Sequence, residues 1–186
     1  CCSFSQGGGG IFTISDCESN LHLINSVIRN NFSADQGGGI RIRFSTNLTL
    51  DNVNILENIS NRSGGGLYLE STPNSEIEFN GSIVVANNSA VSGGGIYSKG
   101  TDIIGDVHIS NNTASGYGGG LQTFEDLVIK HVKIYNNVAK GGGAIGIGYP
   151  TSANTGPFID SCIVSDNYSS EGYTIDIVGG PAFSAP

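Results

Sequence analysis

Short runs in which apolar and polar residues alternate recur along the chain, and they predict β-strands. In one set, which follows clusters of glycine, the first and third residues are apolar in most copies; the runs are 40–42, 67–69, 96–98, 121–123, 145–147 and 175–177. A second set precedes paired polar residues and comprises 53–55, 83–85, 107–109, 132–134 and 162–164. Some copies begin with a further apolar pair: Leu21/Leu23, Leu48/Leu50, Ile77/Phe79 and Leu127/Ile129. Because successive side chains of a strand point to opposite faces, we expect the alternate apolar residues to face a common core.

Two polar signals recur between these strands with nearly the same period. The last glycine of each run is Gly10, Gly39, Gly66, Gly95, Gly120 or Gly143, which gives spacings of 29, 27, 29, 25 and 23 residues. The second signal is a polar pair whose second member is always asparagine: Asn31, Asn58, Asn88, Asn112, Asn137 and Asn167. A repeat of this length is typical of one coil of a solenoid.

The repeat predicts an all-β fold, a right-handed parallel β-helix (β-solenoid) of about 6–7 coils of 23–29 residues over residues 1–178, with a C-terminal tail over 179–186. Strands this short, joined by turns too short for a crossover helix, cannot make a doubly wound sheet. Glycine suits turns that need positive φ or a close approach of the next coil. We expect the asparagines to stack as a ladder, each amide bonding its own turn and the asparagine of the next coil.

Composition excludes several classes of function. The chain has a net charge of −8 and only eight basic residues, so nucleic acid and anionic membrane surfaces are poor partners for it. No apolar stretch approaches the roughly 20 residues of a transmembrane helix, and we expect no membrane insertion. The four cysteines, Cys1, Cys2, Cys17 and Cys162, have no zinc-site spacing. We favour a Cys2–Cys17 disulfide, an inter-subunit role for Cys1 and a buried thiol at Cys162.

Two segments carry a family resemblance. Residues 137–145 (NVAKGGGAI) and 109–114 (ISNNTA) resemble the GGA[ILV] and FxxN repeats of polymorphic outer-membrane proteins, which are β-helical autotransporter passengers and adhesins. The resemblance extends over about residues 7–177, with GGG mostly in place of GGA and with Ile, Leu or Val in place of Phe. It implies a β-helix and a surface-exposed adhesive or structural role.

Many β-helices are polysaccharide lyases or hydrolases, and an enzyme of this kind would place its carboxylates in one register on adjacent coils. Glycoside hydrolysis needs two carboxylates about 5 to 9.5 Å apart. Asp51 and Asp160 share a register but lie four coils apart, with Lys130 in the slot between them. The three histidines, His22, His108 and His131, differ in their offsets from the asparagines, so no metal site is predicted and no cofactor is expected.

One row of outward positions is the predicted binding face: Phe12, Arg41, Tyr68, Tyr97 and Gln122. Aromatic residues on a flat strand face can stack on sugar rings or contact a second protein. The alternative interpretation is that such a ladder only covers and stiffens the sheet.

Eight N-x-S/T sequons indicate a glycosylated secreted protein. Three of them, at Asn31, Asn58 and Asn167, belong to the predicted ladder, where an inward amide could not carry a glycan. The acceptor candidates are therefore Asn47, Asn61, Asn80, Asn87 and Asn111.

These patterns together favour a secreted or cell-surface β-solenoid with a structural or adhesive role and no enzymatic activity. The expected partners are the chain itself or another solenoid segment at the ends of the helix, because exposed strand edges pair with whatever matches them. Glycans or a surface receptor are the expected partners of the face. The alternative is a carbohydrate-active β-helix enzyme or a sugar-binding module.

Overall fold

The computed structural model describes residues 8–71, 76–125, 127–148 and 157–177, apart from the side chains of residues 14–18, 45, 71 and 177. The predicted tail over 179–186, Cys1 and Cys2 lie outside this part, as does the side chain of Cys17. The favoured Cys2–Cys17 disulfide and the inter-subunit role of Cys1 therefore remain predictions. Within the described residues the chain forms strands and turns only.

The strands form three parallel sheets that run the length of the molecule. The first sheet contains β1 (Ile11–Ile24), β4 (Ile40–Asp51), β7 (Leu67–Ser71), β11 (Ile96–Lys99), β14 (Leu121–Thr123), β17 (Ile145–Ile147) and β21 (Ile175–Ile177) in this spatial order, and β8 (Ile77–Asn80) pairs with β4. The second contains β2 (Val27–Arg29), β5 (Asn54–Leu56), β9 (Ser82–Ala86), β12 (Ile103–Ser110), β15 (Val128–Tyr135) and β18 (Phe158–Asp160), and β19 (Ile163–Ser165) also pairs with β15. The third contains β3 (Phe32–Ser33), β6 (Ile59–Ser60), β10 (Ser89–Ala90), β13 (Thr113–Ala114), β16 (Val138–Ala139) and β20 (Tyr168–Ser169).

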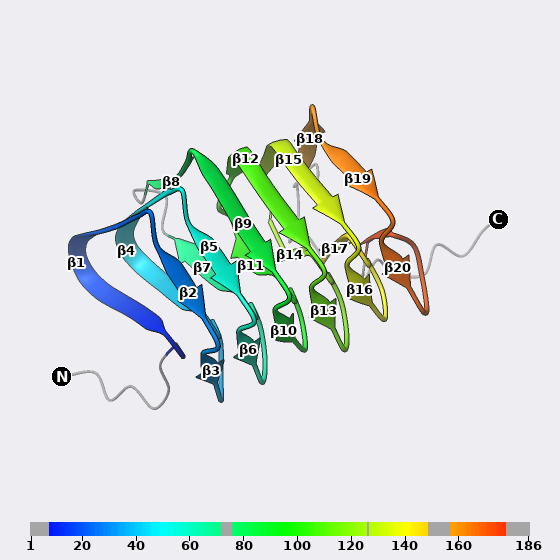
Figure 1. Cartoon of the computed structure of the whole chain (residues 1–186), viewed down its shortest axis with the longest axis horizontal. Coiled ribbons are helices and arrows are strands. Elements are labelled where there is room, and N and C mark those ends of the chain that lie inside the picture. Colours follow the sequence, from blue (N-terminus) through cyan, green and yellow to red (C-terminus); the bar gives the residue numbers. More distant parts are fainter. Residues whose placement is uncertain (1–7, 72–75, 126, 149–156, 178–186) are drawn as a thin grey trace.

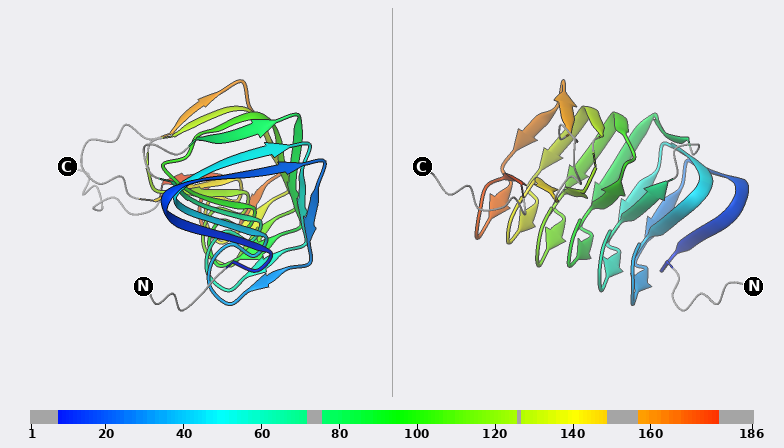
Figure 2. Two further views of the ribbon diagram at one scale, coloured as in Figure 1. Left: turned by 90° about the vertical axis from the view of Figure 1, so that its left-hand side faces the viewer. Right: turned by 180° about the vertical axis from the view of Figure 1, so that it is seen from behind.

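Each coil contributes one segment to every sheet, and the coils lie side by side along one axis (Figure 1). The left view of Figure 2, turned so that one end of the coil faces the viewer, shows the three sheets as the walls of the coil. The predicted fold class is therefore confirmed. The coil length needs correction, because residues stacked on one another are separated by 24 to 30 residues rather than 23 to 29.

The interior is filled by the predicted alternate apolar residues. Ile40, Ile42, Leu67, Leu69 and Leu121 of the first sheet have no exposed surface. The second sheet contributes Val53, Ile55, Ile83, Val85, Val107, Ile109, Val132 and Ile134, which are equally inaccessible. Cys162 occupies the corresponding slot in the last described coil, but it is only half-buried and is a free thiol. The expectation of a buried thiol was wrong because no described strand follows β19 in the second sheet.

The glycine turns are explained by two separate constraints. The first glycine of most runs has positive φ, as at Gly64 (φ 67°), and in the run 141–143 the residue with positive φ is Gly142; side chains disfavour this conformation. The second lies against the next coil, and a Cβ on Gly65 would come within 2.3 Å of the carbonyl oxygen of Gly94. The third slot corrects the sequence alignment: Gly120 stacks on Ala144, not on Gly143. The spacing that reads as 23 residues in the sequence is therefore 24 in the structure, as the register from Leu121 to Ile145 also shows.

Candidate functional site

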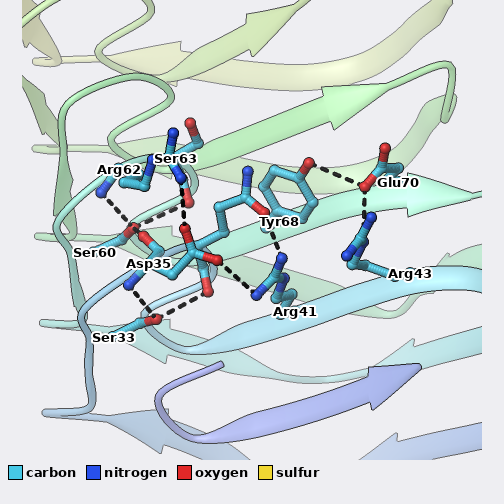
Figure 3. A network of polar contacts seen from close by, with 10 residues as sticks. Ser33, Asp35, Arg41, Arg43, Ser60, Arg62, Ser63, Tyr68 and Glu70 are labelled. Atoms are coloured by element: carbon cyan, nitrogen blue, oxygen red, sulfur yellow. Dashed lines mark hydrogen bonds and ion pairs between the residues drawn. The ribbon is translucent and has the colours of Figure 1, made fainter. Parts of the chain in front are cut away.

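The outer surface of the first sheet carries an ordered array of polar and aromatic side chains from three successive strands. The register pairs Arg41 with Tyr68 and Tyr68 with Tyr97, and two residues further along it pairs Arg43 with Glu70 and Glu70 with Lys99. The intervening Ile42, Leu69 and Ser98 are buried, so the six paired residues all point outward. We call Arg41, Arg43, Tyr68, Glu70, Tyr97 and Lys99 the first-sheet face. Figure 3 shows Arg41, Arg43, Tyr68 and Glu70.

The structure brings the predicted row of five residues together. The guanidinium carbon of Arg41 lies 5.3 Å from the ring centre of Phe12 and 5.6 Å from that of Tyr68. The rings of Tyr68 and Tyr97 are stacked, with centroids 5.0 Å apart and planes 11° apart. Gln122 follows Tyr97 in the register. Such cation and aromatic contacts each contribute about 0.5–1.5 kcal/mol, so the row stiffens the sheet.

The expectation that this whole row is an open binding face needs correction. Arg41 and Tyr68 are each only 4% exposed and Gln122 is 1% exposed. Arg41 is covered by the turn before its strand, where its guanidinium donates to Asp35 and Gln36. A ligand can therefore reach Phe12 and Tyr97, which are partly exposed, but it cannot stack on the buried three.

Asp35 is a buried carboxylate that the sequence analysis missed, because it lies in a turn of variable length rather than in the strand repeat. Its two side-chain oxygens accept hydrogen bonds from different coils, at 2.9 Å from Arg41 and at 3.2 Å from Arg62. Its backbone carbonyl oxygen accepts from the Ser60 hydroxyl at 2.7 Å. These contacts, visible in Figure 3, fix the turn of one coil against the next. Removing Asp35 would break both ion pairs, one of them to the buried Arg41, which is costly.

Glu70 occupies the centre of the second row. One oxygen accepts from Arg43 at 2.9 Å and from the Tyr68 hydroxyl at 3.2 Å, and the other accepts from Lys99 at 3.1 Å. Burial raises the pKa of Glu70, but the hydrogen bonds and charges of Lys99 and Arg43 outweigh it and leave the pKa below its usual value. Burial, together with the charge of Glu70, raises the pKa of Tyr68 well above its usual range. Glu70 is therefore an anion, and Tyr68 a neutral donor, at physiological pH.

The six asparagines form a ladder between the second and third sheets. Each side-chain oxygen from Asn58 onward accepts two hydrogen bonds from the asparagine of the preceding coil, one from its backbone N–H and one from its side-chain amide. All of these bonds are 2.9 or 3.0 Å long. The side-chain amides from Asn58 onward also donate to a backbone carbonyl oxygen of the preceding coil, as Asn112 does to Val85 at 2.9 Å. Asn58, Asn88, Asn112 and Asn137 are buried.

The residue before each ladder asparagine has a role that the sequence analysis did not assign. Asn30, Glu57, Asn87, Asn111, Asn136 and Asp166 all have φ between 53° and 57°. Asparagine and aspartate tolerate this left-handed region better than other residues with side chains. The paired polar signal therefore consists of a corner residue followed by a ladder residue.

The predicted glycan acceptors lie outside the ladder, and their surroundings differ. Asn61, Asn80, Asn87 and Asn111 are exposed. Asn47 is half-buried, donates to the Asn20 side chain and accepts from the Glu76 backbone N–H. Both amide atoms of Asn47 are thus already engaged in the folded chain.

A second charged cluster lies on the outer surface of the second sheet. His108 Nε2 is 3.0 Å from Asp106 Oδ1 and 3.0 Å from Lys133 Nζ, and Lys133 Nζ is 3.1 Å from Asp106 Oδ1. Hydrogen bonds from Lys133 and His108 lower the pKa of Asp106. The three side chains therefore lie within hydrogen-bonding distance of one another.

The other residues considered for catalysis do not converge. Asp160 lies beside Lys130, with Lys130 Nζ 3.3 Å from Asp160 Oδ2, whereas Asp51 stacks on Asn80 in an earlier coil. Among the described side chains, no group of three or more His, Cys, Asp and Glu residues could hold a metal ion. The same part of the chain contains no helix long and apolar enough to span a membrane.

Comparison with known proteins gives one match. A family model described as a right-handed β-helix region matches residues 1–127. No curated protein and no solved structure matches the chain. Because the family model covers more than half of the 186 residues and its fold is the one observed, the chain belongs to the right-handed β-helix family.

Proposed function

We propose that this protein is an extracellular structural or adhesive β-solenoid module that acts through its surface. The observation that carries the proposal is the first-sheet face, in which the outward charged and aromatic side chains are held by partners on neighbouring coils. Side chains that are already ordered lose little conformational entropy when they contact a partner. A flat, fixed pattern of this kind suits recognition of another surface.

Two sequence features support an extracellular, surface-exposed location. The eight sequons include four asparagines that are exposed in the folded chain. The glycine and asparagine repeats resemble those of polymorphic outer-membrane proteins, which are adhesive autotransporter passengers. Their adhesive role is proposed for this chain on the strength of the repeat.

The open edges of the helix support association with a further solenoid segment, from this chain or from another. At one edge β1, β2 and β3 have a neighbour in the described structure on one side only, and at the other edge β18, β20 and β21 are in the same position. The last coil exposes Phe158, Ile163 and Tyr168. Unpaired backbone groups beside apolar surface are a template for an incoming strand, so head-to-tail assembly would bury both.

Light scattering on the purified 186-residue chain tests this assembly. We expect extended particles whose size grows with concentration and falls when a reductant opens an inter-subunit disulfide through Cys1 or Cys2. A compact monomer at all concentrations would contradict self-assembly.

The Asp106–His108–Lys133 cluster favours a second candidate, a carbohydrate-active enzyme or sugar-binding module. An imidazole beside a lysine and a carboxylate has the elements of a general base. A panel of acidic and neutral polysaccharides, incubated with and without calcium, separates the two candidates. We expect no release of reducing or unsaturated ends. Release of ends that His108→Gln abolishes would establish an enzyme and contradict the proposed non-enzymatic solenoid module.

A further inference from the structure

The basic residues of the chain are distributed unevenly among the carboxylates. Each of the eight forms an ion pair. Four of them have a carboxylate that no other lysine or arginine shares: Arg29 with Glu57, Lys130 with Asp160, Lys133 with Asp106, and Lys140 with Glu171. The other four all lie at the first-sheet face or the turn beside it.

At this face two carboxylates are shared by four cations. Asp35 lies between Arg41 and Arg62, and Glu70 lies between Arg43 and Lys99. The formal charge of these six residues is +2, obtained from four positive and two negative groups, in a chain whose net charge is −8. A local surplus of positive charge attracts anions to one part of an otherwise acidic surface.

Three of the four cations are accessible. The side chains of Arg62, Lys99 and Arg43 are 68%, 45% and 26% exposed. Lys99 donates one hydrogen bond to Glu70, and Arg43 bonds the same carboxylate through Nε, so an ammonium and a guanidinium keep donors for a ligand. Tyr97, two residues before Lys99 on β11, is half-buried, because its ring lies between those of Tyr68 and Phe124, with centroids 5.0 and 5.6 Å away. Its hydroxyl group, rather than a ring face, is therefore the part that can meet a ligand.

We infer that the first-sheet face, together with Arg62, binds an acidic glycan, a linear polysaccharide that carries carboxylate or sulfate groups. Arg43, Lys99 and Arg62 hold its acidic groups, and the Tyr97 hydroxyl group bonds a sugar hydroxyl. The inference rests on the proposed adhesive function and names the class of its ligand.

Two features favour a glycan over a nucleic acid. Glu70 lies between the two cations of its row, and Glu125 contributes negative charge near Tyr97. A phosphate backbone is a continuous line of charge and needs an uninterrupted basic surface. An acidic glycan carries sparser charges separated by hydroxyl groups, and carboxylates and tyrosines can bond those hydroxyls.

Affinity electrophoresis of the full chain tests the inference. The gels contain polygalacturonate as the carboxylated polymer, dextran sulfate as the sulfated polymer, or neutral dextran as the control. We expect retardation by at least one acidic polymer, decreasing with salt, and no retardation by dextran. The polymer that retards the chain shows whether the site binds carboxylate or sulfate groups.

Charge-neutralising variants locate the site. We expect Lys99→Gln to weaken binding about threefold to fivefold and Lys99→Gln with Arg62→Gln to weaken it more than tenfold, since each exposed ionic contact is worth up to about 1 kcal/mol. Lys140→Gln is the matched control: it removes the same charge from an exposed lysine paired with Glu171, and it should change binding less than twofold.

Three results would overturn the inference. The first is no retardation by either acidic polymer. The second is that Lys140→Gln and Lys99→Gln weaken polymer binding equally, which would mean that binding depends only on the net charge of the chain. The third is equal, Lys99-dependent retardation by duplex DNA, which would reassign the site to nucleic acid. Each sample is also assayed for newly released polymer ends, so that failure of the proposed non-enzymatic function registers separately from failure to bind.

Discussion

Asn112 and Asn137 share a single oxygen atom, because the backbone N–H and the side-chain amide of Asn112 both donate to Asn137 Oδ1, at 2.9 and 3.0 Å. Asn112 Oδ1 in turn accepts the same two bonds from Asn88. Each coil therefore satisfies the polar groups of the coil before it. Since Asn112 has no exposed surface, water cannot replace a missing partner.

Replacing Asn112 by leucine should destabilise the protein by on the order of 3 kcal/mol, because the Asn88 backbone N–H and the carbonyl oxygen of Val85 lose their partners in a buried site. Thermal or urea unfolding measures the difference. Asn61→Leu, the same substitution at an exposed position, is the control and should have little effect. Equal stability of the two variants would mean that the ladder contributes nothing to the fold.

A methyl group in the third glycine slot should be tolerated at one end of the column and not in the middle. A Cβ on Gly95 would lie 2.7 Å from the carbonyl oxygen of Gly120 and 2.8 Å from the Asn112 amide nitrogen. We expect Gly95→Ala to cost about 1–3 kcal/mol through overpacking. Alanine already fills the equivalent slot at Ala144, where the next coil presents Thr174. Unfolding measurements on Gly95→Ala and on Ala144→Gly should show the larger loss at Gly95, and the opposite order would refute the alignment of the two positions.

The contribution of Glu70 to stability should depend on pH. Its pKa is lower in the folded chain than its usual value, so the stabilisation exists above the usual glutamate pKa and is lost as the pH falls through the lowered value. Glu70→Gln should therefore lower the melting temperature at neutral pH, and the difference from wild type should shrink on acidification. Melting curves between about pH 7 and about pH 3 span this window.

Glu171→Gln is the control for this titration. It removes an exposed carboxylate paired with Lys140, and exposed pairs contribute little. A constant deficit of Glu70→Gln across the whole pH range would show that Glu70 acts through packing and not through its charge.

The sequence predicts the fold well because the β-helix repeats the same constraints in every coil. Alternating apolar residues, a left-handed corner and a glycine turn each recur, so a single irregular copy does not hide the pattern. The register error at Gly143 arose where Ala144 replaces the third glycine. An alignment that counts glycines cannot detect such a substitution, whereas the backbone hydrogen bonds between the two coils identify it.

The candidate site is less predictable, because outward position and exposure are different properties. The pattern places Arg41, Tyr68 and Tyr97 in one outward row, and the register agrees. It gives no sign that the turn containing Asp35 covers Arg41, since that contact depends on a turn outside the repeat. Sharing of Glu70 by Arg43 and Lys99 is likewise visible only once the coils are stacked.

Expression in a host with N-glycosylation should separate the sequons by their place in the coil. A glycan on a ladder asparagine such as Asn58 would replace one of the two amide hydrogens that bond Ile28 and Asn88 and would need space in a buried site, so folded, secreted protein should lack it. Asn61, Asn80, Asn87 and Asn111 are exposed, and a glycan there meets no such conflict. Enzymatic glycan release in ¹⁸O-labelled water converts occupied asparagines to labelled aspartates, which peptide mass spectrometry locates. Asn61→Gln, at an exposed position without positive φ, should remove one glycan without changing stability. A labelled Asn58 in folded protein would contradict the ladder as a barrier to modification.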